Sequence, residues 1–92
     1  MTSVLLLTAP ACHYCDEAQA LLAHFAKEFE LEVETCSAAD AAGRALALAH
    51  GVLFPPAIFV NGVFLQYGRP SERKLRARLL EVGARARASA GP

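Results

Sequence analysis

Two cysteines separated by two residues, Cys12 and Cys15, have the spacing in this 92-residue chain that is best suited to chemistry. They follow an apolar run that ends at Leu7 and precede a stretch of helical periodicity that begins at Asp16. The first turn of a helix has unpaired N–H groups and a positive dipole end, which favour a thiolate over a thiol. Because the thiolate is the reactive form, and because the two cysteines can close a disulfide, the spacing predicts dithiol–disulfide chemistry.

The elements that position this pair follow from the spacing of apolar residues. It predicts helices near residues 16–29, 38–50 and 71–82, and strands near residues 3–8, 31–36, 57–60 and 63–67. Ser37 followed by Asp40 resembles a capping box at the start of the second helix, and Gly51 marks its end. Asn61-Gly62 predicts a tight hairpin, because both residues tolerate positive φ. With a right-handed crossover, the order β-α-β-α-β-β-α gives an α/β fold with a four-stranded mixed sheet and three helices.

The length of the chain predicts one small domain. Hydrophobic residues make up 54% of the chain, but many are alanines, so we expect the core to rest on leucine, valine, isoleucine and the five phenylalanines. We assign residues 1–83 to this domain. Residues 84–92 contain few large apolar side chains, so we expect a frayed C-terminal tail there.

The charged residues balance, with nine Lys and Arg against nine Asp and Glu, which argues against a nucleic-acid-binding protein. Their distribution is uneven. Seven of the eight charged residues before Gly43 are acidic, and eight of the ten from Arg44 onward are basic. Solvated helix faces explain this asymmetry, and the alternative is a surface that docks a partner.

Three cysteines, an odd number, do not match the disulfide framework of a secreted protein. The chain begins without a basic segment followed by a long apolar one, so we expect no signal peptide. No apolar run approaches the length of a membrane span. We therefore expect a cytoplasmic protein with no membrane partner.

The cysteine pair after an apolar strand, together with the run Pro56 to Gly62 (PAIFVNG), resembles the thioredoxin superfamily. The short four-stranded layout is similar to its glutaredoxin-like branch. This resemblance implies a thioredoxin-like fold and a small thiol–disulfide oxidoreductase without a cofactor, which reduces or exchanges disulfides through a mixed disulfide. By the resemblance, Cys12 is the nucleophile, Cys15 is the resolving thiol, and Pro56 is the cis-proline beside the site. Tyr14 matches the family's aromatic position and is expected to line the substrate groove.

Three departures from the glutaredoxin pattern bear on partners. Ala9 stands where glutaredoxins usually have a lysine, and Tyr67-Gly68-Arg69 stands where they usually have paired glycines. Pro55 precedes the expected cis-proline and has no N–H to pair with a substrate backbone. We therefore expect glutathione to be a poor partner. The expected partners of the monomer are a disulfide-containing protein and a protein reductase or thiol donor, with Pro55, Pro56, Tyr67 and Arg69 contacting the substrate.

Other readings of these residues remain open at this stage. His13 either stabilises the Cys12 thiolate as an imidazolium or is a solvent-exposed residue with a modest effect. We expect Cys36 to be a bystander rather than a reactive thiol. Although we predict no metal, one alternative is a metal-binding module, in which Cys12, Cys15, Cys36 and a histidine hold zinc or Cys12 ligates an iron–sulfur cluster shared by a dimer. Another is an adaptor with a redox fold, whose basic last helix docks an acidic partner.

Overall fold

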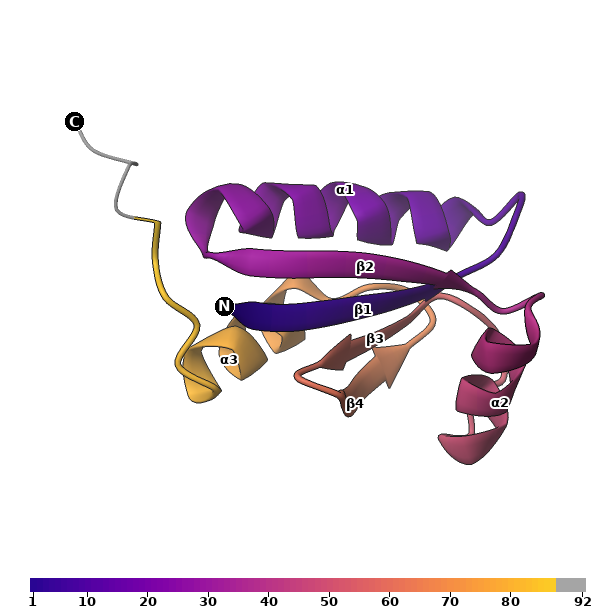
Figure 1. Cartoon of the computed structure of the whole chain (residues 1–92). Coiled ribbons are helices and arrows are strands. Elements are labelled where there is room, and N and C mark those ends of the chain that lie inside the picture. The colour runs from indigo at the N-terminus through magenta and orange to yellow at the C-terminus, as the bar shows by residue number, and fades with distance from the viewer. Residues whose placement is uncertain (88–92) are drawn as a thin grey trace.

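The elements follow one another in the predicted order within residues 1–87, the part of the chain that this computed structural model describes. Figure 1 shows the path of the chain through them. The strands are β1 (Thr2–Thr8), β2 (Leu31–Ser37), β3 (Ala57–Val60) and β4 (Val63–Tyr67). The helices are α1 (His13–Glu28), α2 (Ala41–Ala49) and α3 (Glu72–Glu81).

The four strands form one mixed sheet in the order β2-β1-β3-β4. β1 pairs in parallel with β2, and β3 pairs antiparallel with both β1 and β4. Because β1 has a partner on each side, its apolar residues are enclosed, and Val4, Leu6 and Leu7 have no exposed surface. The mixed four-stranded sheet and the three helices confirm the predicted fold class.

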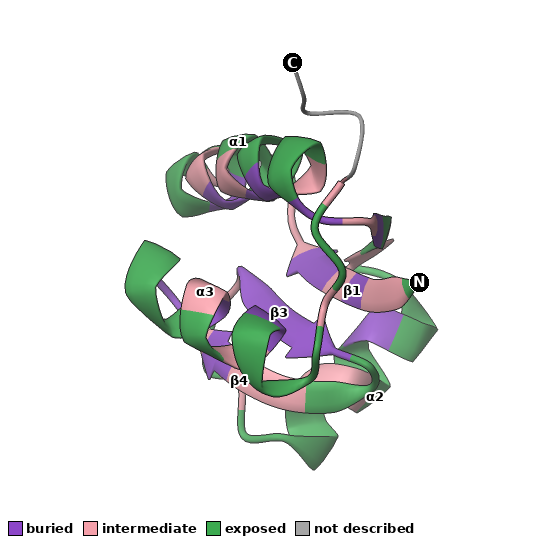
Figure 2. Cartoon of the chain, turned by 90° about the vertical axis from the view of Figure 1, so that its left-hand side faces the viewer, coloured by how far each residue is buried: buried purple, intermediate pink, exposed green. Residues whose placement is uncertain are grey.

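The two faces of the sheet are covered by different helices. α1 and α3 pack on one face, where Phe25 and Leu75 join Val4 and Ile58 in the larger buried cluster. α2 packs on the other face, against the smaller cluster that includes Phe59. Figure 2 shows β3 buried along its length and the outer sides of α1 and α3 exposed. This layering leaves the C-terminal end of β1 and the neighbouring start of β3, next to the start of α1, available for a site.

The hairpin between β3 and β4 forms at the predicted turn. Asn61 and Gly62 have φ values of 51° and 80°, in the left-handed region that these residue types tolerate. The turn is also tied to β1, because the Ser3 N–H donates to Asn61 Oδ1 at 3.0 Å and the Asn61 N–H donates to the Ser3 carbonyl at 2.7 Å. These bonds help fix the register of β3, and with it the position of Pro56 at its start.

The predicted start of the second helix at Ser37 is wrong. Ser37 ends β2, and its hydroxyl accepts the Ala39 N–H at 3.1 Å in a local turn. The Ala38 N–H instead extends the sheet by donating to the Thr8 carbonyl at 2.7 Å. Asp40 is the residue that precedes α2, and its side chain makes no capping bond. The Ser37 side chain therefore stabilises a turn and does not cap the helix. The sequence pattern did not distinguish these two roles, because serine bonds to nearby backbone N–H groups in both.

The segment after α3 is paired as far as it is described. Ala86 forms a bridge with Phe29, and backbone bonds join Glu30 to Arg85 at 2.8 Å and Arg87 to Glu28 at 3.0 Å. Residues 84–87, which their composition predicts to be frayed, are therefore joined by backbone hydrogen bonds to the last residue of α1 and to the chain directly after it. The rest of the expected tail, residues 88–92, lies outside the described residues. None of the helices within residues 1–87 is long and apolar enough to cross a membrane.

Candidate active site

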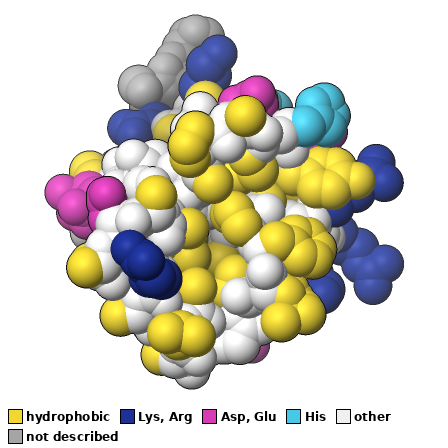
Figure 3. Space-filling view, turned by 90° about the vertical axis from the view of Figure 1, so that its right-hand side faces the viewer, with side chains coloured by type: hydrophobic (Ala, Val, Ile, Leu, Met, Phe, Trp, Pro, Cys, Tyr) yellow, Lys and Arg dark blue, Asp and Glu magenta, His cyan; other side chains and the backbone are white. Residues whose placement is uncertain are grey.

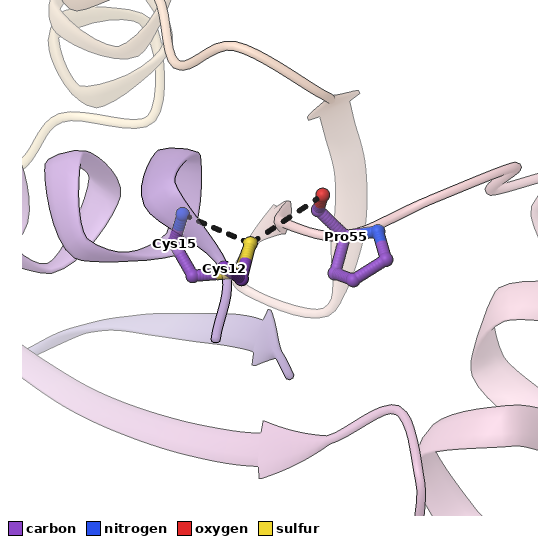
Figure 4. Close-up of a disulfide and its surroundings, with 3 residues drawn as sticks. All are labelled: Cys12, Cys15 and Pro55. Carbon is purple, nitrogen blue, oxygen red and sulfur yellow. Dashed lines mark hydrogen bonds between the residues drawn. A yellow bond between two sulfur atoms is a disulfide. The ribbon is translucent and has the colours of Figure 1, made fainter. Parts of the chain in front are cut away.

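Cys12 and Cys15 form a disulfide at the start of α1, with their Cα atoms 5.1 Å apart (Figure 4). The helix begins at His13, three residues earlier than its periodicity predicts, so Cys12 is the N-cap residue and Cys15 lies in the first turn. Ala11 turns the chain into the helix with a φ of 53°, a left-handed value that is uncommon for a residue with a Cβ. Cys12 is half-buried, whereas Cys15 is 1% exposed. A second molecule can therefore approach Cys12 far more readily than Cys15.

Two backbone groups of opposite character face the Cys12 sulfur. The Cys15 N–H donates to Cys12 Sγ at 3.2 Å, and the Pro55 carbonyl oxygen lies 3.9 Å from the same sulfur, as Figure 4 shows. An N–H stabilises a thiolate, and a carbonyl oxygen disfavours one. The donor is closer, and the positive end of the α1 dipole acts in the same direction. A closely placed N–H donor and the positive end of a helix dipole are features that stabilise a thiolate.

The Pro55–Pro56 segment brings the start of β3 to the disulfide. The peptide bond between these prolines is cis, as the family resemblance predicts. Pro56 is buried, and its carbonyl accepts the Gly68 N–H at 2.8 Å, which links the start of β3 to the end of β4. Pro55 is half-buried, and its carbonyl points to Cys12 (Figure 4). The carbonyl of Pro55, one of the predicted substrate-binding residues, therefore lies next to the disulfide.

Sequence reasoning missed Phe54, which stands directly before the two prolines. The residue is 52% exposed, and its ring lies edge-on to the ring of Tyr67, with centroids 5.4 Å apart. Tyr67 is half-buried at the end of β4, and Arg69 is exposed just beyond it. Arg69 has no ion pair within residues 1–87. The signal that could have found Phe54 is a large aromatic residue placed directly before Pro-Pro, two positions from the expected cis-proline.

His13 and Tyr14 lie on the exposed side of the first turn of α1. His13 Nε2 is 2.9 Å from Glu17 Oε2, one turn further along the helix. The His13 ring also lies beside Tyr14, which is 40% exposed, with ring centroids 5.8 Å apart. The contact of His13 with Glu17 rather than with a cysteine sulfur favours the reading in which its effect on Cys12 is modest.

Cys36 lies in a different environment from the other two cysteines. It is half-buried near the end of β2, pairs with Leu7 across the sheet, and packs against the smaller buried cluster beneath α2. Within residues 1–87, no three His, Cys, Asp or Glu side chains lie close enough to share a metal ion. The arrangement therefore gives no support to a zinc site built from Cys12, Cys15 and Cys36.

A disulfide at the start of the first helix, beside a proline segment that opens the third strand of a mixed sheet, defines a thiol–disulfide oxidoreductase with a thioredoxin-like fold. No protein-family model matches the chain. It is 32% identical over 76 residues to a probable thioredoxin of Archaeoglobus fulgidus, covering 83% of this chain and 84% of that protein. The chain belongs to the thioredoxin family.

Solved structures are similar in fold. A thioredoxin-like protein from Clostridium perfringens superposes with a TM-score of 0.71, at 17% identity, over 90% of this chain and 71% of that one. Glutaredoxin 1 from Francisella tularensis superposes with a TM-score of 0.54, at 19% identity, over 89% and 96% of the two chains. Membership of the thioredoxin superfamily, predicted from the sequence, is confirmed, and the assignment to its glutaredoxin-like branch stays a prediction.

Proposed function

We propose that this protein reduces disulfides in other proteins, with Cys12 as the nucleophile and Cys15 as the resolving thiol. The observation that carries the proposal is the difference between the two sulfurs. Cys12 is half-buried, caps the helix and accepts the Cys15 N–H, whereas Cys15 is 1% exposed. Attack from outside needs an accessible thiolate, and resolution needs a second thiol that is sheltered and close.

The reaction begins from the dithiol. The Cys12 thiolate attacks one sulfur of the substrate disulfide, and the other substrate sulfur leaves as a thiolate and takes up a proton. Cys15 then loses its proton and attacks the Cys12 sulfur of the mixed disulfide, which releases the second substrate thiol. Two electrons and two protons have passed to the substrate, and the Cys12–Cys15 disulfide has formed. A protein reductase or a thiol donor returns two electrons to it.

The groups around Cys12 limit how a substrate docks. The Pro55 carbonyl can accept one N–H from a polypeptide joined to Cys12, but Pro55 has no N–H to offer in return. Glutathione carries two carboxylates, which normally draw on cations and backbone N–H donors. Ala9 supplies no cation, Pro55 supplies no donor, and Gly68 lies against the ring of Phe54. These features favour protein partners over glutathione.

The test compares two coupled assays. One measures reduction of insulin with thioredoxin reductase as the electron source, and the other measures turnover of a glutathionylated peptide with glutathione and glutathione reductase. We expect activity in the first, loss of it in Cys12→Ser, and a trapped mixed disulfide in Cys15→Ser. Efficient saturable turnover with glutathione and none with thioredoxin reductase would overturn the choice of partner. Retained activity in Cys12→Ser would overturn the mechanism.

A further inference from the structure

Phe54 is exposed but held in place. Just over half of its surface is open to solvent, at 52%. On its protein side the ring lies edge-on to Tyr67 and covers Gly68, where a Cβ atom would come within 3.3 Å of the ring. A surface aromatic with partners on one side loses little conformational freedom when something packs on the other side.

The position of Phe54 relative to the reactive sulfur is also constrained. It is joined to Pro55, whose carbonyl oxygen lies 3.9 Å from Cys12 Sγ. Both residues that follow Phe54 are prolines, whose rings fix φ, so this connection is stiff. Consecutive Cα atoms are about 3.8 Å apart. The ring therefore lies within reach of a residue next to the cysteine of a substrate bonded to Cys12.

The surface at this end of the molecule is apolar. Figure 3 shows hydrophobic side chains gathered over the middle of the face and charged side chains around its rim. Leu53 and Phe54, which directly precede the prolines, are exposed apolar residues, and so are Leu48 on α2 and Tyr14 in the first turn of α1. A polypeptide with an apolar residue beside its cysteine fits this surface better than one with a charged residue.

We propose that Phe54 is a specificity-determining residue whose free face takes a large apolar side chain adjacent in sequence to the reacting cysteine of a protein disulfide. The inference rests on the proposed function, since it concerns the substrate of the Cys12–Cys15 dithiol. It adds the chemical class of that substrate: disulfides flanked by leucine, phenylalanine or a similar residue are reduced in preference to those flanked by small polar or acidic ones.

The test uses a set of cyclic disulfide peptides that differ only in the residue after one cysteine: Leu, Ser or Asp. Reduction by the pre-reduced protein gives kcat/KM for each peptide. We expect the wild type to prefer the Leu peptide over the Ser peptide by about tenfold. Phe54→Ser should remove this preference, and Phe54→Leu should keep part of it. Val63→Ser is the matched control, because Val63 is 58% exposed but lies at the turn end of the β3–β4 hairpin, opposite the end next to Pro56, and it should keep the preference in full.

A second substrate separates failure of this inference from failure of the proposed function. Reduction of 2-hydroxyethyl disulfide, which has no side chain to place on Phe54, reports the dithiol chemistry by itself, and Phe54→Ser should lose less of this rate than of its rate with the Leu peptide. A wild type that reduces neither this compound nor the peptides would overturn the proposed function. An equal preference in wild type and Phe54→Ser, or a preference for the Asp peptide that Arg69→Ser removes, would overturn the role of Phe54. If Phe54→Ser does not fold, the intermediate preference expected of Phe54→Leu decides the question.

Discussion

Gly43 occupies a place in α2 where no side chain fits. A Cβ atom added there would lie 2.7 Å from the carbonyl carbon of Ser37 and 3.1 Å from the Cα of Ala38, and closer still to the Ser37 oxygen. These are backbone atoms, which cannot rotate away as a flexible side chain can. Gly43→Ala must therefore push α2 away from the end of β2.

Two effects of opposite sign decide the outcome for stability. Helix propensity alone favours alanine over glycine by about 1 kcal/mol. Overpacking costs about 1–3 kcal/mol, and contact with backbone atoms places this substitution at the upper end of that range. We therefore expect Gly43→Ala to lower the free energy of unfolding by about 2 kcal/mol. The active site is also affected, because the Ala38 N–H is bonded to the carbonyl of Thr8, the last residue of β1 before the active-site loop.

The assay is urea unfolding followed by far-UV circular dichroism, together with the rate of insulin reduction. Ala45→Gly is the control, because it changes an exposed position of the same helix, and propensity alone should lower its free energy of unfolding by about 1 kcal/mol. We expect Gly43→Ala to be the less stable variant and the slower one. If Gly43→Ala were as stable as the wild type or more so, the close approach of α2 to β2 would be refuted.

Three further predictions concern the site and the packing of α1 on α3. In the Cys15→Ser variant, the Cys12 thiol should titrate below the range of an ordinary cysteine, as thiolate absorbance against pH would reveal; a normal titration would contradict the role of the helix start. Pro55→Ala restores a backbone donor beside Cys12 and should lower KM for the Ser peptide described above, whereas an unchanged KM would mean that substrates do not pair with this segment. The hydrogen bond from Arg76 holds the pKa of the Glu28 carboxyl below its usual range. The stabilisation that this bond gives is therefore present above the pKa of Glu28 in the unfolded state, and it is lost as pH falls through the pKa of Glu28 in the folded state. Arg76→Gln should therefore be destabilised at neutral pH, and urea unfolding should show that difference shrinking in acid; a difference that persists there would assign the effect to packing of Arg76 on Phe25.

Apolar spacing was sufficient to predict the existence and order of every strand and helix, although Leu31 is the one buried residue of β2 and Gly43 the one buried residue of α2. The Asn61-Gly62 turn was also predictable, since it depends on the conformational freedom of its own residues. The start of α1 was not, because its first residues have no apolar pattern and cysteine is not among the residues that usually cap a helix. That cap is supplied by the Cys12 sulfur, the atom at the centre of the site.

Two other features that the sequence did not predict depend on contacts between distant residues. Residues 84–87 pair with the chain after α1, and nothing in their own composition indicates that partner. Phe54 was overlooked because its importance depends on Tyr67 and Gly68, which meet it only in the folded chain. For the candidate site, the reactive pair could be predicted from its spacing and the proline segment from the family resemblance, whereas the contacts of Phe54 with Tyr67 and Gly68 could not be predicted from either.

A dithiol site can recognise a substrate through its backbone or through its side chains, and Pro55 changes the balance between the two. Pro55 supplies one backbone acceptor and no donor. It therefore offers a substrate a single hydrogen bond, with a net contribution of about 0.5–1.5 kcal/mol. Full burial of a phenylalanine contributes about 1.5–3 kcal/mol, so the exposed half of Phe54 has about 1 kcal/mol available to a substrate. The two contributions are of the same size. In the proposed mechanism, a substrate without an apolar residue at this position depends on one hydrogen bond, and side-chain contact at Phe54 therefore decides which disulfides react first.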